Sequence, residues 1–191
     1  MNSSSTHRRS LAPSPWIVRF AALVAPGARV LDLAAGYGRH ALLFAGRGAS
    51  VVAVDRDAGA LGSLAASPRV ETRVADLEAG AWPFAGELFD AVVVVHYLHR
   101  ALLPQILATL ASDGVLLYET FARGNAAYGK PSNPAFLLEP GELLELARER
   151  LTVIAFEQGR VEGAPPAVIQ RLAAVGRARA WPTPLPEKGL G

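Results

Sequence analysis

Residues 30–55 constrain the fold of this 191-residue chain more than any other stretch. They open with an apolar run at 30–33, of the kind that forms a buried parallel strand, and a turn with two glycines follows. A helical pattern over 41–45 and a second apolar strand at 50–54 then lead to Asp55. Such a unit binds an adenosine-containing cofactor, because the glycines let the backbone approach the ligand and the acid accepts both ribose hydroxyls.

The glycine turn is compatible with two cofactors. The run at 36–41, GYGRHA, satisfies the dinucleotide fingerprint with alanine in the third place, and Asp55 lies at about the expected distance. Asp32, at the end of the first strand, would repel a pyrophosphate but can hold an ammonium group, directly or through water. Two alanines before Gly36 also make the turn longer than a tight pyrophosphate-binding one. These features favour S-adenosyl-L-methionine, and an NAD(P)-dependent oxidoreductase remains the alternative.

The run at 30–39, VLDLAAGYGR, resembles the class I S-adenosylmethionine-dependent methyltransferases, which usually have glycine at the position of Ala34. The resemblance covers about residues 18–177. It implies an α/β, Rossmann-like fold: a seven-stranded, mostly parallel sheet with an antiparallel last strand and helices on both faces. It also implies a set of cofactor-binding positions at the strand ends, with the adenine held after the third strand. These are Asp32, Ala34, Gly36, Gly38, Asp55, Arg56, Ala75, Asp76, Leu77 and His96.

The carboxyl-terminal part separates the two cofactor hypotheses by its order of elements. Residues 151–156 and 167–175 are predicted strands, and the loop between them has no helical pattern, so the two strands should pair antiparallel. A dehydrogenase would return through another crossover helix. We therefore expect a methyltransferase domain at 12–178, a disordered tail at 1–11 and a flexible, proline-rich tail at 179–191. Further elements are predicted as helices at 15–24, 57–66, 100–111 and 139–150, strands at 69–74, 89–95 and 115–119, and an irregular segment at 121–138.

Methyl transfer from a sulfonium is an in-line displacement. The protein must place the acceptor behind the methyl group, and it needs a base only where the acceptor holds its proton tightly. Positioning side chains should come from the ends of the first, fourth and fifth strands: Tyr37, His40, His96, Tyr97, His99, Arg100, Glu119, Arg123 and Tyr128. We rank His96 and Tyr97 first as catalytic residues, and Tyr37, Arg123 and Tyr128 as substrate contacts. A lone histidine at a strand end is as often a packed residue as a base.

Several classes of partner are disfavoured. The formal net charge is only +2, and no run of lysine or arginine interleaved with aromatics indicates a nucleic-acid surface. N-methylation of adenine, cytosine or glutamine is disfavoured because residues 96–99, HYLH, do not show the acid or amide, the proline and the two aromatics of those enzymes. The chain has no cysteine, which excludes thiolate zinc sites and disulfides, and we expect no metal.

The small size and the segments 32–45 and 133–147 look most similar to small bacterial methyltransferases of the tellurite-resistance type. The resemblance implies a small-molecule methyl acceptor, either a soft nucleophile or an oxyanion. A catalytically silent, cofactor-binding partner subunit is a further alternative. Because Pro13, Pro15 and Arg19 interrupt any export signal, we expect a cytoplasmic protein without a membrane partner, and at most a weak homodimer.

Overall fold

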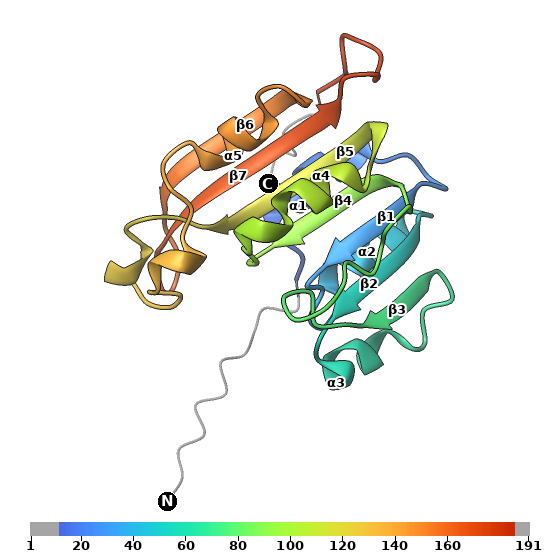
Figure 1. Cartoon of the computed structure of the whole chain (residues 1–191), viewed down its shortest axis with the longest axis horizontal. Coiled ribbons are helices and arrows are strands. Elements are labelled where there is room, and N and C mark those ends of the chain that lie inside the picture. Colours follow the sequence, from blue (N-terminus) through green and yellow to red (C-terminus); the bar gives the residue numbers. More distant parts are fainter. Residues whose placement is uncertain (1–11, 186–191) are drawn as a thin grey trace, which may run out of the picture.

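A computed structural model describes residues 12–185 and shows one twisted seven-stranded sheet (Figure 1). The strands are β1 (Arg29–Leu33), β2 (Ser50–Asp55), β3 (Val70–Val74), β4 (Phe89–Val95), β5 (Leu110–Phe121), β6 (Leu151–Val161) and β7 (Ala167–Gly176). Their order is β3-β2-β1-β4-β5-β7-β6, and among them β7 alone runs against its neighbours. The predicted fold class is confirmed, including the hairpin that a dehydrogenase would replace by a crossover helix.

Helices cover both faces of the sheet. They are α1 (Pro15–Phe20), η1 (Ala21–Leu23), α2 (Arg39–Gly46), α3 (Ala58–Leu61), η2 (Gly62–Leu64), η3 (Arg100–Leu102), α4 (Leu103–Ala108), η4 (Asn125–Ala127), η5 (Pro134–Phe136) and α5 (Glu142–Ala147). Buried side chains of α1, α2 and α3 belong to one apolar cluster, and those of α4 and α5 belong to the other. None of the helices within residues 12–185 combines the length and the apolar character that crossing a bilayer requires.

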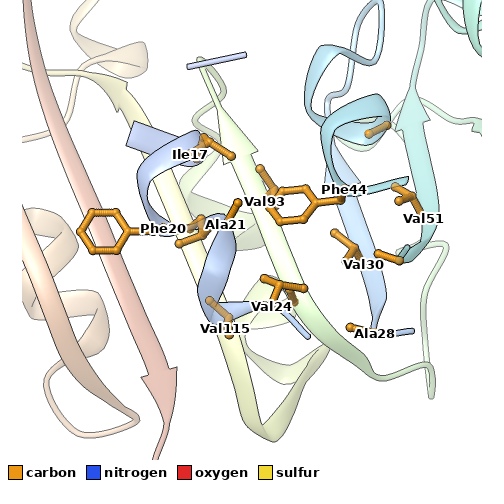
Figure 2. Close-up of a cluster of buried hydrophobic side chains, with 14 of the residues drawn as sticks. Ile17, Phe20, Ala21, Val24, Ala28, Val30, Phe44, Val51, Val93 and Val115 are labelled. Atoms are coloured by element: carbon orange, nitrogen blue, oxygen red, sulfur yellow. The ribbon is translucent and has the colours of Figure 1, made fainter. Parts of the chain in front are cut away.

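Strand β4 shows why the sheet needs two covering layers. Its residues alternate in direction, so Ala91, Val93 and Val95 enter the first cluster while Val92 and Val94 enter the second. A strand that is buried on both faces reads as a continuous apolar run, which is the pattern of a central parallel strand. In the first cluster, α1 brings Ile17 and Phe20, and α2 brings Phe44, onto the face that carries Val93 (Figure 2).

Two strands are longer than predicted. Helix α4 ends at Ala108, before the predicted residue 111, and β5 already begins at Leu110 with a register shift between β4 and β5. Gly114 lies at this irregularity, where an added Cβ would approach two backbone carbonyls at 3.1 Å. Strand β6 continues to Val161, because it pairs with β7 along its whole length. Pairing with a neighbouring strand decided both boundaries.

The predicted amino-terminal tail at 1–11 lies outside the described residues, as does the part of the other tail beyond residue 185. Within the described part, Arg179 donates hydrogen bonds to the carbonyls of Leu23, at 2.7 Å, and Asp113. Thr183 is buried, whereas Trp181 is 72% exposed. The segment that follows β7 is therefore held against η1 and the start of β5 by Arg179.

Candidate functional site

The glycine turn after β1 is folded onto the end of β2. The amide of Gly36 donates to Oδ2 of Asp55 at 2.8 Å, and the amide of Ala35 donates to the carbonyl of Val54 at 2.9 Å. Gly36 and Gly38 both have positive φ, of 55° and 71°. At Gly38 an added Cβ would also lie 2.4 Å from the buried Leu64 side chain. The turn therefore depends on glycine at residue 38 for both conformation and space.

Asp32 is buried at the end of β1, and its Oδ2 accepts a hydrogen bond from the amide of Ala41, in the first turn of α2, at 2.8 Å. Burial raises the pKa of the Asp32 carboxyl to about 7, although the Ala41 amide and the charge of Arg39 both act to lower it. A ligand cation beside this carboxyl would favour its ionised form.

Asp55 holds the neighbouring loops with both carboxylate oxygens. Oδ2 accepts from Gly36, and Oδ1 accepts from the amide of Asp57 at 2.9 Å. The side chain is half-buried, while Arg56 beside it is exposed. A carboxylate oxygen accepts more than one hydrogen bond, so these contacts orient the group and leave it acceptor capacity.

The residues after β3 lie next to Asp55. The amide of Ala75 donates to the carbonyl of Asp55 at 3.0 Å, and Leu77 is buried in the second apolar cluster. Asp76, between them, is exposed, and its Oδ1 accepts from the amide of Glu78 at 2.9 Å. The structure thus brings the predicted ribose and adenine positions together at one edge of the sheet.

His96 and Tyr97 follow β4 and have different neighbours. The imidazole of His96 lies near Glu119 of β5, with Nε2 3.9 Å from Oε1, and it stacks on Phe121. The Tyr97 hydroxyl is buried, and burial followed by the charge of Glu78 raises the pKa of that hydroxyl. The two predicted catalytic residues therefore face different surroundings, and only His96 lies against a buried carboxylate.

The three predicted substrate contacts also belong to the carboxyl-terminal edge of the parallel strands. Tyr37 lies on the glycine turn with a 52% exposed side chain. Arg123 follows β5, is largely exposed and pairs with Glu139 at 3.2 Å. Tyr128 is half-buried and directly follows η4, which packs on β7.

The predicted irregular segment at 121–138 is anchored at several points. Arg100 donates to the carbonyls of Ala135 and Leu137 and forms an ion pair with Glu142. The Glu142 carboxylate raises the pKa of the Arg100 guanidinium. Asn125 is buried, donates to the carbonyl of Pro131 and accepts from the amide of Val168. Arg100 therefore supports this segment of the site edge through ordinary structural contacts.

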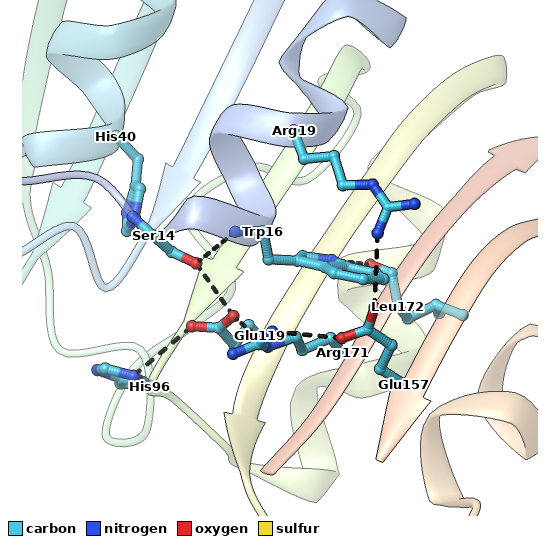
Figure 3. Close-up of polar contacts among 9 residues, drawn as sticks. All are labelled: Ser14, Trp16, Arg19, His40, His96, Glu119, Glu157, Arg171 and Leu172. Carbon is cyan, nitrogen blue, oxygen red and sulfur yellow. Dashed lines mark hydrogen bonds and ion pairs between the residues drawn. The ribbon is translucent and has the colours of Figure 1, made fainter. Parts of the chain in front are cut away.

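The amino-terminal segment reaches the site as well (Figure 3). The amide of Ser14 donates to Nε2 of His40 at 3.1 Å, and its hydroxyl donates to Oε2 of Glu119 at 3.0 Å. Burial, with the charges of Arg39 and His96, lowers the pKa of His40 to about 3, so His40 is neutral at pH 7. Arg171 of β7 lies 2.9 Å from the same Glu119 oxygen.

Sequence reasoning missed Ser14 and Arg171, and it gave Glu119 no role of its own. A usable signal was present, because GVLLYETF and AVIQRLAAV each place one charge inside an apolar strand. In the structure these two charges, Glu119 and Arg171, are cross-strand partners. Opposite charges in strands that pair are the pattern that would have indicated this contact.

Ala34 has a φ of 54°, in the left-handed region that costs a non-glycine residue about 1–2 kcal/mol. We expect Ala34→Gly to raise the free energy of unfolding by about 0.5–1 kcal/mol, since relief of strain outweighs the added backbone entropy. The neighbouring Ala35 has no positive φ, so Ala35→Gly should lower the same quantity by a similar amount. Urea denaturation of the three proteins measures both changes, and equal signs would contradict the assigned conformation.

Comparison with known protein families decides the class of protein. A family model described as a methyltransferase domain matches residues 30–114, which include the glycine turn, Asp55, residues 75–77 and His96. Residues 30–114 are thus similar to a methyltransferase domain. This match supports the predicted enzyme class, and the chain has the fold that the resemblance implied.

Solved structures share the fold of this chain at low sequence identity. TehB from Haemophilus influenzae is 19% identical, with a TM-score of 0.69 over 84% of this chain and 61% of that chain. A SAM-dependent methyltransferase from Methanosarcina mazei is 15% identical, with a TM-score of 0.65 over 86% and 98%. A TehB-like SAM-dependent methyltransferase from Corynebacterium glutamicum is 20% identical, with a TM-score of 0.60 over 85% and 87%. The present chain therefore spans less than two thirds of the Haemophilus chain. A search of curated proteins found no match.

Proposed function

We propose that this methyltransferase transfers a methyl group from S-adenosyl-L-methionine to a small-molecule acceptor, a soft nucleophile or an oxyanion, by in-line displacement. The observation that carries the proposal is the convergence of Asp32, the glycine turn, Asp55 and residues 75–77 beside His96 at one sheet edge. The cofactor is the one named for two of the solved structures with this fold.

The chemistry of the donor set fits this cofactor. Asp55 would accept the ribose hydroxyls, because its oxygens are already oriented by Gly36 and Asp57. Asp32 would hold the methionine ammonium, directly or through water, and residues 75–77 would flank the adenine. When bound, S-adenosyl-L-methionine supplies an electrophilic methyl group on a sulfonium. The chain's own part is to place the acceptor in line with that group, beside His96 and Tyr97, and to exclude water.

A small acceptor agrees with the architecture. Within residues 12–185 the chain consists of one sheet, its covering helices and their connections, with no second module for docking a macromolecule. Among the same residues, no group of three or more His, Asp or Glu side chains is arranged to hold a metal ion.

Calorimetric titration of the purified chain with S-adenosylhomocysteine and, separately, with NADH tests the proposal. We expect micromolar binding of S-adenosylhomocysteine and none of NADH. Binding of NADH alone would replace the proposal with an oxidoreductase. Binding of neither would show that the chain lacks the proposed cofactor site, and either of these results contradicts methyl transfer by this chain.

A further inference from the structure

A buried carboxylate reaches the exposed histidine at the end of β4. Glu119 is only 6% exposed, and its Oε1 lies 3.9 Å from Nε2 of His96 (Figure 3). Its backbone carbonyl also accepts the amide N–H of His96 at 2.8 Å. Glu119 therefore holds His96 at two points, one on the main chain and one on the side chain.

The His96 ring is fixed by two further features. Its backbone has a φ of 57°, a conformation that a non-glycine residue adopts only when the surrounding structure imposes it. The ring stacks on Phe121, with the ring centroids 4.8 Å apart. The side chain is still 44% exposed, so a ligand at the sheet edge can reach it.

The second oxygen of Glu119 is fixed by other groups. Oε2 accepts from the Ser14 hydroxyl at 3.0 Å and lies 2.9 Å from Nε of Arg171. Arg171 in turn contacts Glu157 of β6 at 3.3 Å. One oxygen of the carboxylate is thereby held by the amino-terminal segment and β7, and the other oxygen, Oε1, is directed at His96.

Building on the proposed function, we propose that Glu119 is a positioning residue that holds His96 as general base for an acceptor whose nucleophilic atom carries a proton. With Nε2–H directed at the carboxylate, the lone pair of the neutral ring lies on Nδ1. In the transfer step, the acceptor oxygen, sulfur or nitrogen bonds to the methyl carbon while its proton passes to Nδ1. The carbon–sulfur electron pair goes to the sulfur, which leaves as a neutral thioether. A general base at this position favours acceptors whose nucleophilic atom carries a proton when they bind, such as thiols and hydroxyls.

Among the charged groups near His96, Glu119 favours the protonated form of the ring, whereas Arg171 opposes it. Glu119 on β5 supplies a negative charge, and Arg171 on β7 lies behind that carboxylate. His40 on α2 is buried and neutral, so it does not compete for the proton. An ionised acid beside an imidazole orients the ring and stabilises the imidazolium that forms during proton transfer. The distance of 3.9 Å is long for a hydrogen bond, and such contacts tighten when substrate binds.

Nitrogen NMR of the histidine imidazoles in the full chain tests the inference. We compare the wild type with Glu119→Gln and with a control, Glu157→Gln. The control removes a carboxylate that pairs with the same Arg171 but does not contact His96. A third variant, His96→Gln, assigns the His96 resonance. We expect the pKa of His96 to fall by about one unit in Glu119→Gln and to stay unchanged in Glu157→Gln. The wild type should show the Nε2–H tautomer. An unchanged pKa of His96 in Glu119→Gln, or an Nδ1–H tautomer of His96 in the wild type, overturns the inference. The tautomer is measured in the wild type, so this result is obtained even if Glu119→Gln does not fold.

Methyl transfer to simple probes adds a functional readout. With 2-mercaptoethanol or phenol as acceptor, Glu119→Gln should lower kcat at pH 7 by tenfold or more, with a smaller loss at pH 9, where the probes ionise more readily. Faster transfer to dimethyl sulfide or pyridine, which carry no acceptor proton, overturns the inference. If the wild type binds S-adenosylhomocysteine but the pKa of His96 is the same in Glu119→Gln, only this inference is refuted. A wild type that fails to bind S-adenosylhomocysteine refutes the proposed function itself.

Discussion

Replacing Asp55 with alanine is expected to weaken binding of S-adenosylhomocysteine by roughly 10–150-fold. Hydrogen bonds to a charged group contribute about 1.5–3 kcal/mol, and the ribose hydroxyls would lose such an acceptor. The effect has a second source, because Oδ2 of Asp55 also accepts the amide of Gly36 at 2.8 Å. Without the carboxylate, the glycine turn loses one of the two hydrogen bonds that hold it to the end of β2. Calorimetric titration of both proteins measures the change.

Asp57→Ala is the matched control for this prediction. Asp57 lies two residues further on and its Oδ1 accepts the amide of Ala60, as the cap of α3, so it has no contact with the glycine turn. Its loss should lower the stability by about 1 kcal/mol and leave the affinity almost unchanged. Equal affinities for the wild type and Asp55→Ala would refute the ribose contact.

The largest loss of stability is expected for Trp16→Ala. Trp16 is 2% exposed on α1, packs on Phe20 with the ring centroids 4.5 Å apart, and donates its indole N–H to the carbonyl of Leu172. Truncation of a buried tryptophan costs about 3–5 kcal/mol, because the cavity it leaves collapses only in part. In a domain of this size that lowers the melting temperature by roughly 6–20 °C.

Val18→Ala provides the comparison on the same helix. Val18 is 49% exposed, so its truncation should change the free energy of unfolding by at most about 0.5 kcal/mol. Chemical denaturation followed by fluorescence measures Val18→Ala, and circular dichroism follows Trp16→Ala, which lacks one of the tryptophans. Similar losses in the two variants would show that α1 does not form part of the core.

The sheet was predictable because its central strands can be recognised from their own apolar residues. Residues 30–33 and 89–95 are apolar on both faces, a pattern that only burial between two layers explains. The reversed direction of β7 followed from the missing helix before it. The site edge followed in turn, since Asp32, Asp55 and His96 each end a predicted parallel strand.

The residues that sequence reasoning missed depend on contacts between distant elements. Ser14 reads as an ordinary helix cap, and only the packing of α1 brings its hydroxyl to Glu119. The pairing of Glu119 with Arg171 requires the register between β5 and β7, which the pattern of either strand leaves open. The left-handed backbone of Ala34 and His96 is a local strain, and neither residue type predicts it.

The contact between α1 and β7 determines when α1 can complete its packing during synthesis of the chain. Trp16 precedes its hydrogen-bond partner Leu172 by 156 residues. A ribosome that adds about 5–20 residues per second needs on the order of ten seconds or more to make that stretch. Throughout this interval the buried face of α1, with Trp16, Ile17 and Phe20, lacks the strand that accepts the indole N–H of Trp16. A growing chain therefore exposes this apolar face to chaperones until β7 has been made, and aggregation competes with folding most strongly in that period.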